Sequence, residues 1–303
     1  MKKASLSKRI AWRIEAFAYD CVCLLLKPFS FDRISAFGGW LFRLIGPRTS
    51  KNHIMQTGFD IAFPNLSSAQ KAKLTKDAWD NIGRTFAEFP IMDRVHVYDD
   101  SPRAVVIGRE HLDTLKDSRR GAVIVTGHFA NWEVMAAALT QSGLPVRITY
   151  RKINNPHIDK RVRQQRQAYG TKFLVQKSTH AGARQLLSAI EKGESVALLN
   201  DQKFNEGISI PFFGKDAMTA TGPARLALKT GAPILPISVT RDKANFTVTV
   251  HAPFHLKDTG ERAADTEAGV EQIVKWTEDW IIQNPSQWFW VHRRWPKPLY
   301  KND

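Results

Sequence analysis

The stretch "GHFANWE", residues 127–133, follows the apolar run "AVIVT" and places His128 five positions ahead of Glu133. On one continuous helix, five residues rotate a side chain about 140° beyond a full turn, so the two groups would diverge. They can meet if His128 lies in a turn after a strand and Glu133 lies on the first turn of the next helix. Asn131 is then expected to cap that helix.

A carboxylate that accepts a hydrogen bond from one imidazole nitrogen leaves the other nitrogen free as a general base. The spacing therefore favours a catalytic pair of His128 and Glu133, and a purely structural hydrogen bond is an equally supported interpretation. Such a base would act on a substrate hydroxyl, because no G-x-S-x-G motif and no nearby cysteine supplies a nucleophile. A metal site is not expected, because the motifs H-E-x-x-H, Walker A and G-x-G-x-x-G are absent.

The elements that must position these residues alternate along the middle of the chain. Segments of helical composition separate four short apolar runs, at 121–127, 145–151, 194–201 and 232–240. This alternation predicts an α/β fold with a mainly parallel central sheet flanked by helices. A fifth run, 245–254, follows closely and alternates in polarity, which is typical of an antiparallel or edge strand.

Polar side chains gather where the first three of these strands are expected to end. His128 follows the first strand, Arg151 the second, and Asp201 with Gln202 the third. In open α/β sheets, ligands bind outside the carboxyl ends of the strands. The candidate base is therefore in a functional position.

The charge balance narrows the class of partner. With 44 Lys and Arg against 29 Asp and Glu, the formal net charge of the 303 residues is +15, so polyanions are the expected partners. Nucleic acid is not expected, because the sequence lacks a zinc finger, an RNP-like aromatic run and a helix-turn-helix. An anionic membrane and phosphorylated substrates therefore remain as the expected polyanionic partners.

Residues 1–46 are predicted to form membrane-associating helices, ahead of an α/β domain over 47–303. Read as a helix, the first segment carries an apolar stripe of Ile10, Ile14, Phe17, Cys21, Leu24 and Leu25. Its basic start and Trp12 suit a helix lying in a membrane interface, and a helix packed on the core is an equally supported alternative. The uninterrupted apolar run is far shorter than the ~20 residues of a spanning helix.

"GHFANWE" resembles the H-x4-D/E block of the lysophospholipid acyltransferase superfamily, and the surrounding sequence is similar to the late acyltransferases of lipid A biosynthesis, the lauroyl and myristoyl transferases. The similarity continues in order through four further stretches: "YRKINNP" with "RVRQQRQAYG", "NDQK" followed by "PFFG", "TGPARLALKTGAPILPI", and "NPSQWFWVHRRW". The resemblance covers at least residues 105–295.

The resemblance implies transfer of a fatty acyl chain from an acyl carrier protein thioester to a hydroxyl of a lipid A precursor. It implies a glycerolipid acyltransferase-like fold at the cytoplasmic face of the bacterial inner membrane, and no cofactor beyond the thioester co-substrate. His128 would be the general base and Glu133 its partner. The positions expected to bind or shape the substrate site are Arg151, Asp201, Gln202, Asn131 and Gly214.

Two alternatives stay open at this point. One is an acyltransferase that acts on another lysophospholipid or glycolipid. The other is a membrane glycolipid-binding protein without catalytic activity.

Overall fold

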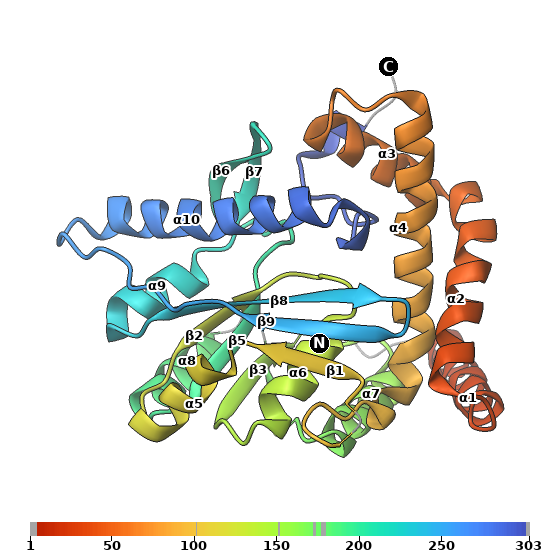
Figure 1. Ribbon diagram of the computed structural model, residues 1–303, viewed down its shortest axis with the longest axis horizontal. Helices are drawn as coiled ribbons and strands as arrows, with labels where there is room; N and C mark the ends of the chain where they lie inside the picture. Colours follow the sequence, from red (N-terminus) through yellow and green to blue (C-terminus); the bar gives the residue numbers. More distant parts are fainter. Residues whose placement is uncertain (1–4, 101, 151, 172–173, 177–179, 301–303) are drawn as a thin grey trace.

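The computed structural model describes residues 5–100, 102–150, 152–171, 174–176 and 180–300. Its centre is a seven-stranded sheet in the order β1-β9-β8-β2-β5-β3-β4 (Figure 1). The strands are β1 (Ala104–Ile107), β2 (Val123–Thr126), β3 (Val146–Tyr150), β4 (Leu174–Gln176), β5 (Ser195–Leu199), β8 (Ile234–Asp242) and β9 (Asn245–Val250). A separate hairpin is formed by β6 (Ile208–Phe212) and β7 (Lys215–Thr219).

The predicted mainly parallel sheet is confirmed. β2 pairs in parallel with both β5 and β8, and β3 pairs in parallel with β5 and β4. The run at 245–254 forms β9, which is antiparallel to β8 as expected but is no edge strand, because β1 covers its other side. β1 and β4 were not predicted; β4 has three residues, too few to show a pattern.

Helices cover both faces of the sheet, and β2 contributes to both cores. Ile124 packs in the cluster that contains the apolar side of α6, whereas Val123 and Val125 pack in the cluster with α8, α9 and α10. This alternation follows from the period of two along a strand. The helices are α5 (Arg109–Ser118), α6 (Trp132–Gln141), α7 (Pro156–Ala168), α8 (His180–Glu191), α9 (Gly222–Thr230) and α10 (Arg262–Gln283).

A helical layer stands at one end of the sheet, where α4 and α2 lie side by side (Figure 1). The two approach closely at glycines: a Cβ on Gly83 would lie 2.2 Å from the carbonyl oxygen of Gly38. Ser67 caps α4 in a capping box with Gln70. The helices of this layer are α1 (Leu6–Leu26), α2 (Phe31–Ile45), α3 (Ser50–Ala62) and α4 (Ser68–Glu88). Short 3-10 helices span Gly46–Arg48, Phe89–Arg94, Pro285–Gln287 and Lys297–Tyr300.

The predicted division after residue 46 stays a prediction, although α2 packs closely on α4 across it. α1 docks on α7 through polar side chains: the Tyr19 hydroxyl donates to Gln165 at 2.6 Å, and Arg161 pairs with Asp20. Its apolar stripe therefore faces outward, and Ala16 is its buried residue. Within the described segments, no helix combines the length and hydropathy that crossing a bilayer requires.

A buried ion pair joins this helical layer to the sheet. Both oxygens of Glu88, at the end of α4, accept from the guanidinium of Arg241 on β8, at 2.7 and 2.9 Å. The side chains are 0% and 5% exposed. Ser35 of α2 donates to the same carboxylate at 2.6 Å. Three elements far apart in sequence therefore meet at one desolvated carboxylate.

Replacing Glu88 with alanine is expected to lower the free energy of unfolding by about 3 to 5 kcal/mol, because Arg241 would remain buried without its charged partner. Urea unfolding followed by circular dichroism measures this loss. Lys73→Ala removes a solvent-exposed ion pair with Asp77 and serves as the control, with little change expected. A Glu88→Ala protein as stable as the control would contradict the prediction.

Candidate active site

The register of the sheet brings His128 and Asp201 together. β2 and β5 are parallel neighbours in which Thr126 lies opposite Leu199, the last residue of each strand. His128 and Asp201 each follow two residues later, and the Asn200 amide extends the ladder by donating to the Thr126 carbonyl at 3.0 Å. The two side chains therefore leave adjacent strands at the same level of the carboxyl edge.

Asp201 holds His128 at two points. Its Oδ1 lies 2.8 Å from the imidazole Nδ1, and its Oδ2 accepts the His128 backbone N–H at 2.8 Å. The indole N–H of Trp288 donates to the same Oδ2 at 2.8 Å. Burial raises the pKa of Asp201, but the neighbouring His128 and these hydrogen bonds outweigh burial and hold the pKa well below its ordinary value. The carboxylate is therefore ionised at neutral pH.

The second ring nitrogen of His128 is the one available for chemistry. An ionised carboxylate can only accept, so Nδ1 carries the proton and Nε2 carries the lone pair. The amide nitrogen of Gln202 lies 3.2 Å from Nε2 and can donate to it. The His128 side chain is 17% exposed, whereas that of Asp201 is 1% exposed. Asp201 is thus buried and holds the imidazole in place, while the His128 side chain is partly accessible.

In the structure His128 pairs with Asp201 and Glu133 with other residues, so the role of Glu133 as partner of the base stays a prediction. Glu133 is 2% exposed and its carboxylate is bound by two residues of the α7 region: the guanidinium of Arg166 and the hydroxyl of Tyr169. Burial and the negative charge of Glu133 raise the pKa of Tyr169 well above its ordinary value, so the phenol stays a donor. Glu133 therefore fixes α6 to α7 through Arg166 and Tyr169. The carboxylate that contacts His128 comes instead from Asp201, which follows the adjacent strand β5.

The turn between His128 and α6 is held in an unusual conformation. Ala130 has φ of +44°, a left-handed value that a residue with a side chain adopts only when its surroundings impose it. Its N–H donates to the carbonyl of Gln287 at 2.7 Å, and its own carbonyl accepts from the Thr85 hydroxyl at 2.8 Å. These two bonds fix the backbone that carries His128.

Asn131 caps α6 as predicted, accepting from the Glu133 amide at 3.1 Å. Its side-chain nitrogen donates to Glu88 at 2.8 Å, and the residue is fully buried. Both ends of its amide are used inside the protein, and a contact of Asn131 with substrate stays a prediction. The cap instead connects the candidate site to the buried ion pair of Glu88.

Aromatic rings surround the exposed side of His128. The ring of Trp132 lies 4.8 Å from the imidazole, edge to face, and that of Phe289 lies 6.0 Å away. Trp132 and Phe289 also contact each other at 5.5 Å. The imidazole of His128 is therefore in contact with two aromatic rings and with the Gln202 amide.

Two further positions were predicted for the site. Arg151 lies outside the described residues. Gly214 follows Phe213 in the two-residue loop between β6 and β7, where both have positive φ, +70° and +49°. This is the backbone of a tight hairpin turn, so the structure gives Gly214 a conformational role in the hairpin. The expectation that it shapes a cleft beside His128 stays a prediction.

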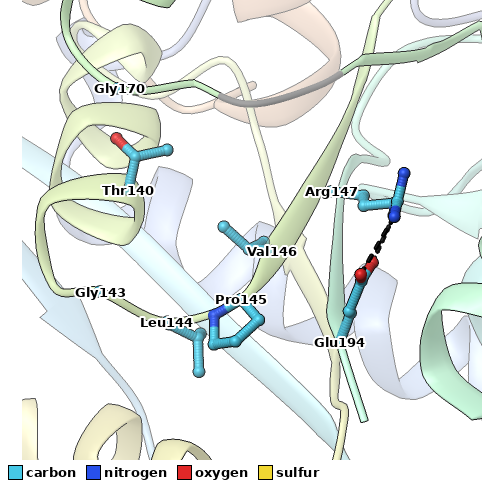
Figure 2. A pocket seen from close by; sticks show the side chains of 8 residues that line it. All are labelled: Thr140, Gly143, Leu144, Pro145, Val146, Arg147, Gly170 and Glu194. Atoms are coloured by element: carbon cyan, nitrogen blue, oxygen red, sulfur yellow. Dashed lines mark hydrogen bonds and ion pairs between the residues drawn. The ribbon is translucent and has the colours of Figure 1, made fainter. Parts of the chain in front are cut away.

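One hollow lies at the opposite edge of the sheet from His128. It has a volume of about 380 Å³ and is lined by Val146, where β3 begins, and by the ion-paired Arg147 and Glu194 (Figure 2). His128 lies where the parallel strands end, so this hollow is no part of its site. No cluster of three or more His, Cys, Asp or Glu side chains in the described ranges is arranged to hold a metal.

Comparison with known proteins identifies the family. The sequence profile described as bacterial lipid A biosynthesis acyltransferase matches residues 2–297. The chain belongs to this family. The resemblance seen in the ordered sequence blocks is confirmed, and the chain is an acyltransferase of the lipid A biosynthesis type.

Three relatives place it within this group. A lipid A biosynthesis lauroyltransferase from Escherichia coli (strain K12) is 26% identical over 251 residues, 80% of this chain and 78% of the relative. A palmitoleoyltransferase of the same pathway and strain is 25% identical over 254 residues, with the same coverage. A phosphatidylinositol mannoside acyltransferase from Mycolicibacterium smegmatis is 24% identical over 189 residues, 60% of this chain and 62% of the relative.

Sequence reasoning missed three parts of the acyltransferase site. Arg166 was not singled out, yet it forms an ion pair with the buried Glu133. Trp288 was not singled out either, yet its indole N–H donates to Asp201. Asp201 itself was placed in the site, but its pairing with His128 was not foreseen. Strand adjacency is the signal that could have found this pair.

His292 of the acyltransferase predicts a pH dependence of stability. Burial lowers its pKa from 6.5 to about 4. Between these values the unfolded chain binds a proton that the folded state does not, so stability is lost as the pH falls from 6.5 towards 4, by up to about 3 kcal/mol. Urea unfolding at several pH values is expected to show a weaker acid loss in His292→Gln than in the wild type. Parallel profiles of the two proteins would contradict the prediction.

Proposed function

We propose that this enzyme transfers a fatty acyl chain from an acyl carrier protein thioester to a hydroxyl of a lipid A precursor, with His128 as general base and Asp201 as its orienting partner. The observation that carries the proposal is the hydrogen bond between Nδ1 of His128 and buried Asp201, which leaves an accessible Nε2 at the carboxyl edge of the sheet. Family membership supports the acyl and lipid A parts of the proposal.

In the proposed reaction, the acceptor hydroxyl replaces the Gln202 amide as the partner of Nε2. Nε2 removes the hydroxyl proton while the oxygen attacks the thioester carbon, forming a C–O bond and an oxyanion. The C–S bond then breaks, the carbonyl reforms, and the imidazolium returns its proton to the thiolate. The products are the ester and the free thiol of the carrier.

Two groups would lower the barrier. Asp201 fixes the tautomer and stabilises the imidazolium, because its carboxylate is ionised and contacts Nδ1. The Gln202 side-chain amide, once released from Nε2, can donate to the oxyanion. Glu133 and Arg166 contribute by holding the first turn of α6 against α7.

We propose that the enzyme works at the cytoplasmic face of the inner membrane, with α1 and α2 lying in the interface. Large apolar side chains face outward on both helices; Phe17 and Leu25 of α1 are each 69% exposed, and Trp40 of α2 is 51% exposed. The net charge of +15 favours an anionic surface. An exposed apolar face of this kind is characteristic of a membrane or protein interface.

Purified enzyme, labelled acyl carrier protein and a lipid A precursor test the reaction directly. We expect one labelled acyl ester per acceptor, and mass spectrometry of lipid A from a deletion strain should show one missing acyl chain. Unchanged lipid A would reject the proposed acceptor. Parallel assays with phosphatidylinositol mannoside and with a lysophospholipid decide whether another acceptor is preferred.

Vesicle flotation tests the membrane location. The enzyme should float with anionic vesicles and resist extraction by high salt, and Phe17→Glu with Leu25→Glu should weaken the binding. Asp20 lies on the face of α1 that docks on α7, so the outward substitutions leave that contact in place. Complete extraction of the wild type by salt alone would overturn the location.

A further inference from the structure

A second hollow adjoins the candidate site, and we call it the Lys51–Arg293 hollow. It has a volume of about 320 Å³ and is formed by the first turns of α3 together with the chain just beyond Trp290. Its lining residues are Ser50, Lys51, Ile54, Val291, His292 and Arg293. The proposed reaction mechanism uses none of these six residues.

One short segment connects the hollow to the reacting centre. Trp288 donates to Asp201 and Phe289 lies against the ring of His128, while residues 291–293 line the hollow. His292 lies close enough to Asp201 and Lys51 for their charges to act on its imidazole. Residues 288–293 therefore join the reacting centre to the hollow along one short stretch of chain.

The hollow carries positive charge that the protein does not neutralise. Lys51 and Arg293 are exposed, and neither takes part in an ion pair with a carboxylate in the described part of the chain. Ser50 and Lys51 also begin α3, whose N-cap Thr49 makes no side-chain capping bond. The unpaired amides and the positive end of the helix add to the two cationic side chains.

We propose that the Lys51–Arg293 hollow binds a phosphate group of the substrate and so positions the reacting atoms at His128. Two cationic side chains and a helix N-terminus together suit a phosphate, and Arg can bind it through two parallel hydrogen bonds. Ile54 and Val291 offer apolar contact to the carbon atoms beside the phosphate. Holding a remote group in this way raises the rate through orientation.

This inference rests on the proposed function, which supplies two sources of phosphate. The phosphopantetheine arm of the acyl carrier protein contains a phosphodiester. A lipid A precursor contains phosphate monoesters on its sugars. Both present the same oxygen acceptors, so the experiment has to distinguish the sources.

Binding of inorganic phosphate to the full chain tests the hollow without catalysis. Sodium phosphate should raise the thermal unfolding midpoint of the wild type by more than sodium chloride does at equal ionic strength. Arg293→Gln should need at least about tenfold more phosphate for the same rise, because a charged hydrogen-bond donor is lost. Lys229→Gln is the matched control: its side chain is exposed in the last turn of α9, at the far end of the molecule from α3 (Figure 1).

Two results would overturn the phosphate site. One is a wild-type midpoint that phosphate raises no more than chloride does. The other is an unchanged response in the Lys51→Gln/Arg293→Gln double variant, which would mean that phosphate binds elsewhere. Both substitutions keep most of the side-chain length at exposed positions, so the variants are expected to fold like the wild type.

Kinetics then identify the source of the phosphate. If the donor supplies it, Arg293→Gln raises the KM for acyl carrier protein, and free 4′-phosphopantetheine competes with inorganic phosphate. If the acceptor supplies it, the KM for the lipid rises and glucosamine 6-phosphate competes. Phosphate binding with both KM values unchanged would reject a substrate role. Absence of acyl transfer in the wild type would instead reject the proposed function, while the binding result still decides whether the hollow takes phosphate.

Discussion

Replacing His128 with alanine is expected to reduce the rate of acyl transfer by about 10² to 10⁴-fold, the usual contribution of a positioned general base. The reason is that no other described side chain in the site combines an accessible lone pair with an ionised partner behind it. Single-turnover transfer from labelled acyl carrier protein measures the chemical step. The KM for the acceptor should change much less than kcat, because the aromatic walls around the ring remain.

Folding has to be controlled in this experiment, because Asp201 is buried and loses its imidazole partner in the variant. Circular dichroism and urea unfolding should show a native His128→Ala protein with some loss of stability. His96→Ala is a matched control, since His96 is exposed and its side chain has no role in the site. Wild-type activity in His128→Ala would remove the basis of the proposed mechanism.

The central sheet was predictable from local pattern. The runs that became β2, β3, β5 and β8 are short, apolar and bounded by helical segments, and this alternation indicates parallel pairing. The position of His128 after β2 followed from the same pattern. These features need nothing beyond neighbours in sequence, so the sequence alone was sufficient to predict them.

The partner of His128 was not predictable from spacing alone. Glu133 lies five residues away and a strand-to-helix turn permits contact, so a local search selects it. Asp201 lies 73 residues away and becomes a neighbour only when β5 pairs with β2. Strand order is set by how whole helices pack on the sheet, and no short segment carries that information.

The same limit applies to the supports of the site. Glu88 and Arg241 are 153 residues apart, and their charged side chains predict surface positions until tertiary packing buries them together. The amphipathic pattern of α1 was correct, yet sequence alone left open which surroundings its apolar stripe faces. Its polar contacts with α7 turn that stripe outward.

Asp201→Asn is expected to reduce kcat by about 10² to 10⁴-fold across the neutral pH range. An asparagine can present its amide N–H to Nδ1, which would place the ring proton on Nε2 and remove the lone pair needed as base. Because the pKa of Asp201 is held well below its ordinary value, the wild-type carboxylate stays ionised throughout this range. Single-turnover transfer at pH 7 measures the loss.

Asp265→Asn is the matched control for this substitution. Asp265 is also a buried carboxylate, accepting from the Thr259 amide and hydroxyl at 2.9 and 2.7 Å, but it lies on α10 in a separate network. Its variant should lose some stability and keep the wild-type kcat. If Asp201→Asn instead lost stability and kept the wild-type kcat, the carboxylate beside Nδ1 would have only a structural role. Glu133 would then be the candidate partner of His128, despite its contacts with Arg166 and Tyr169.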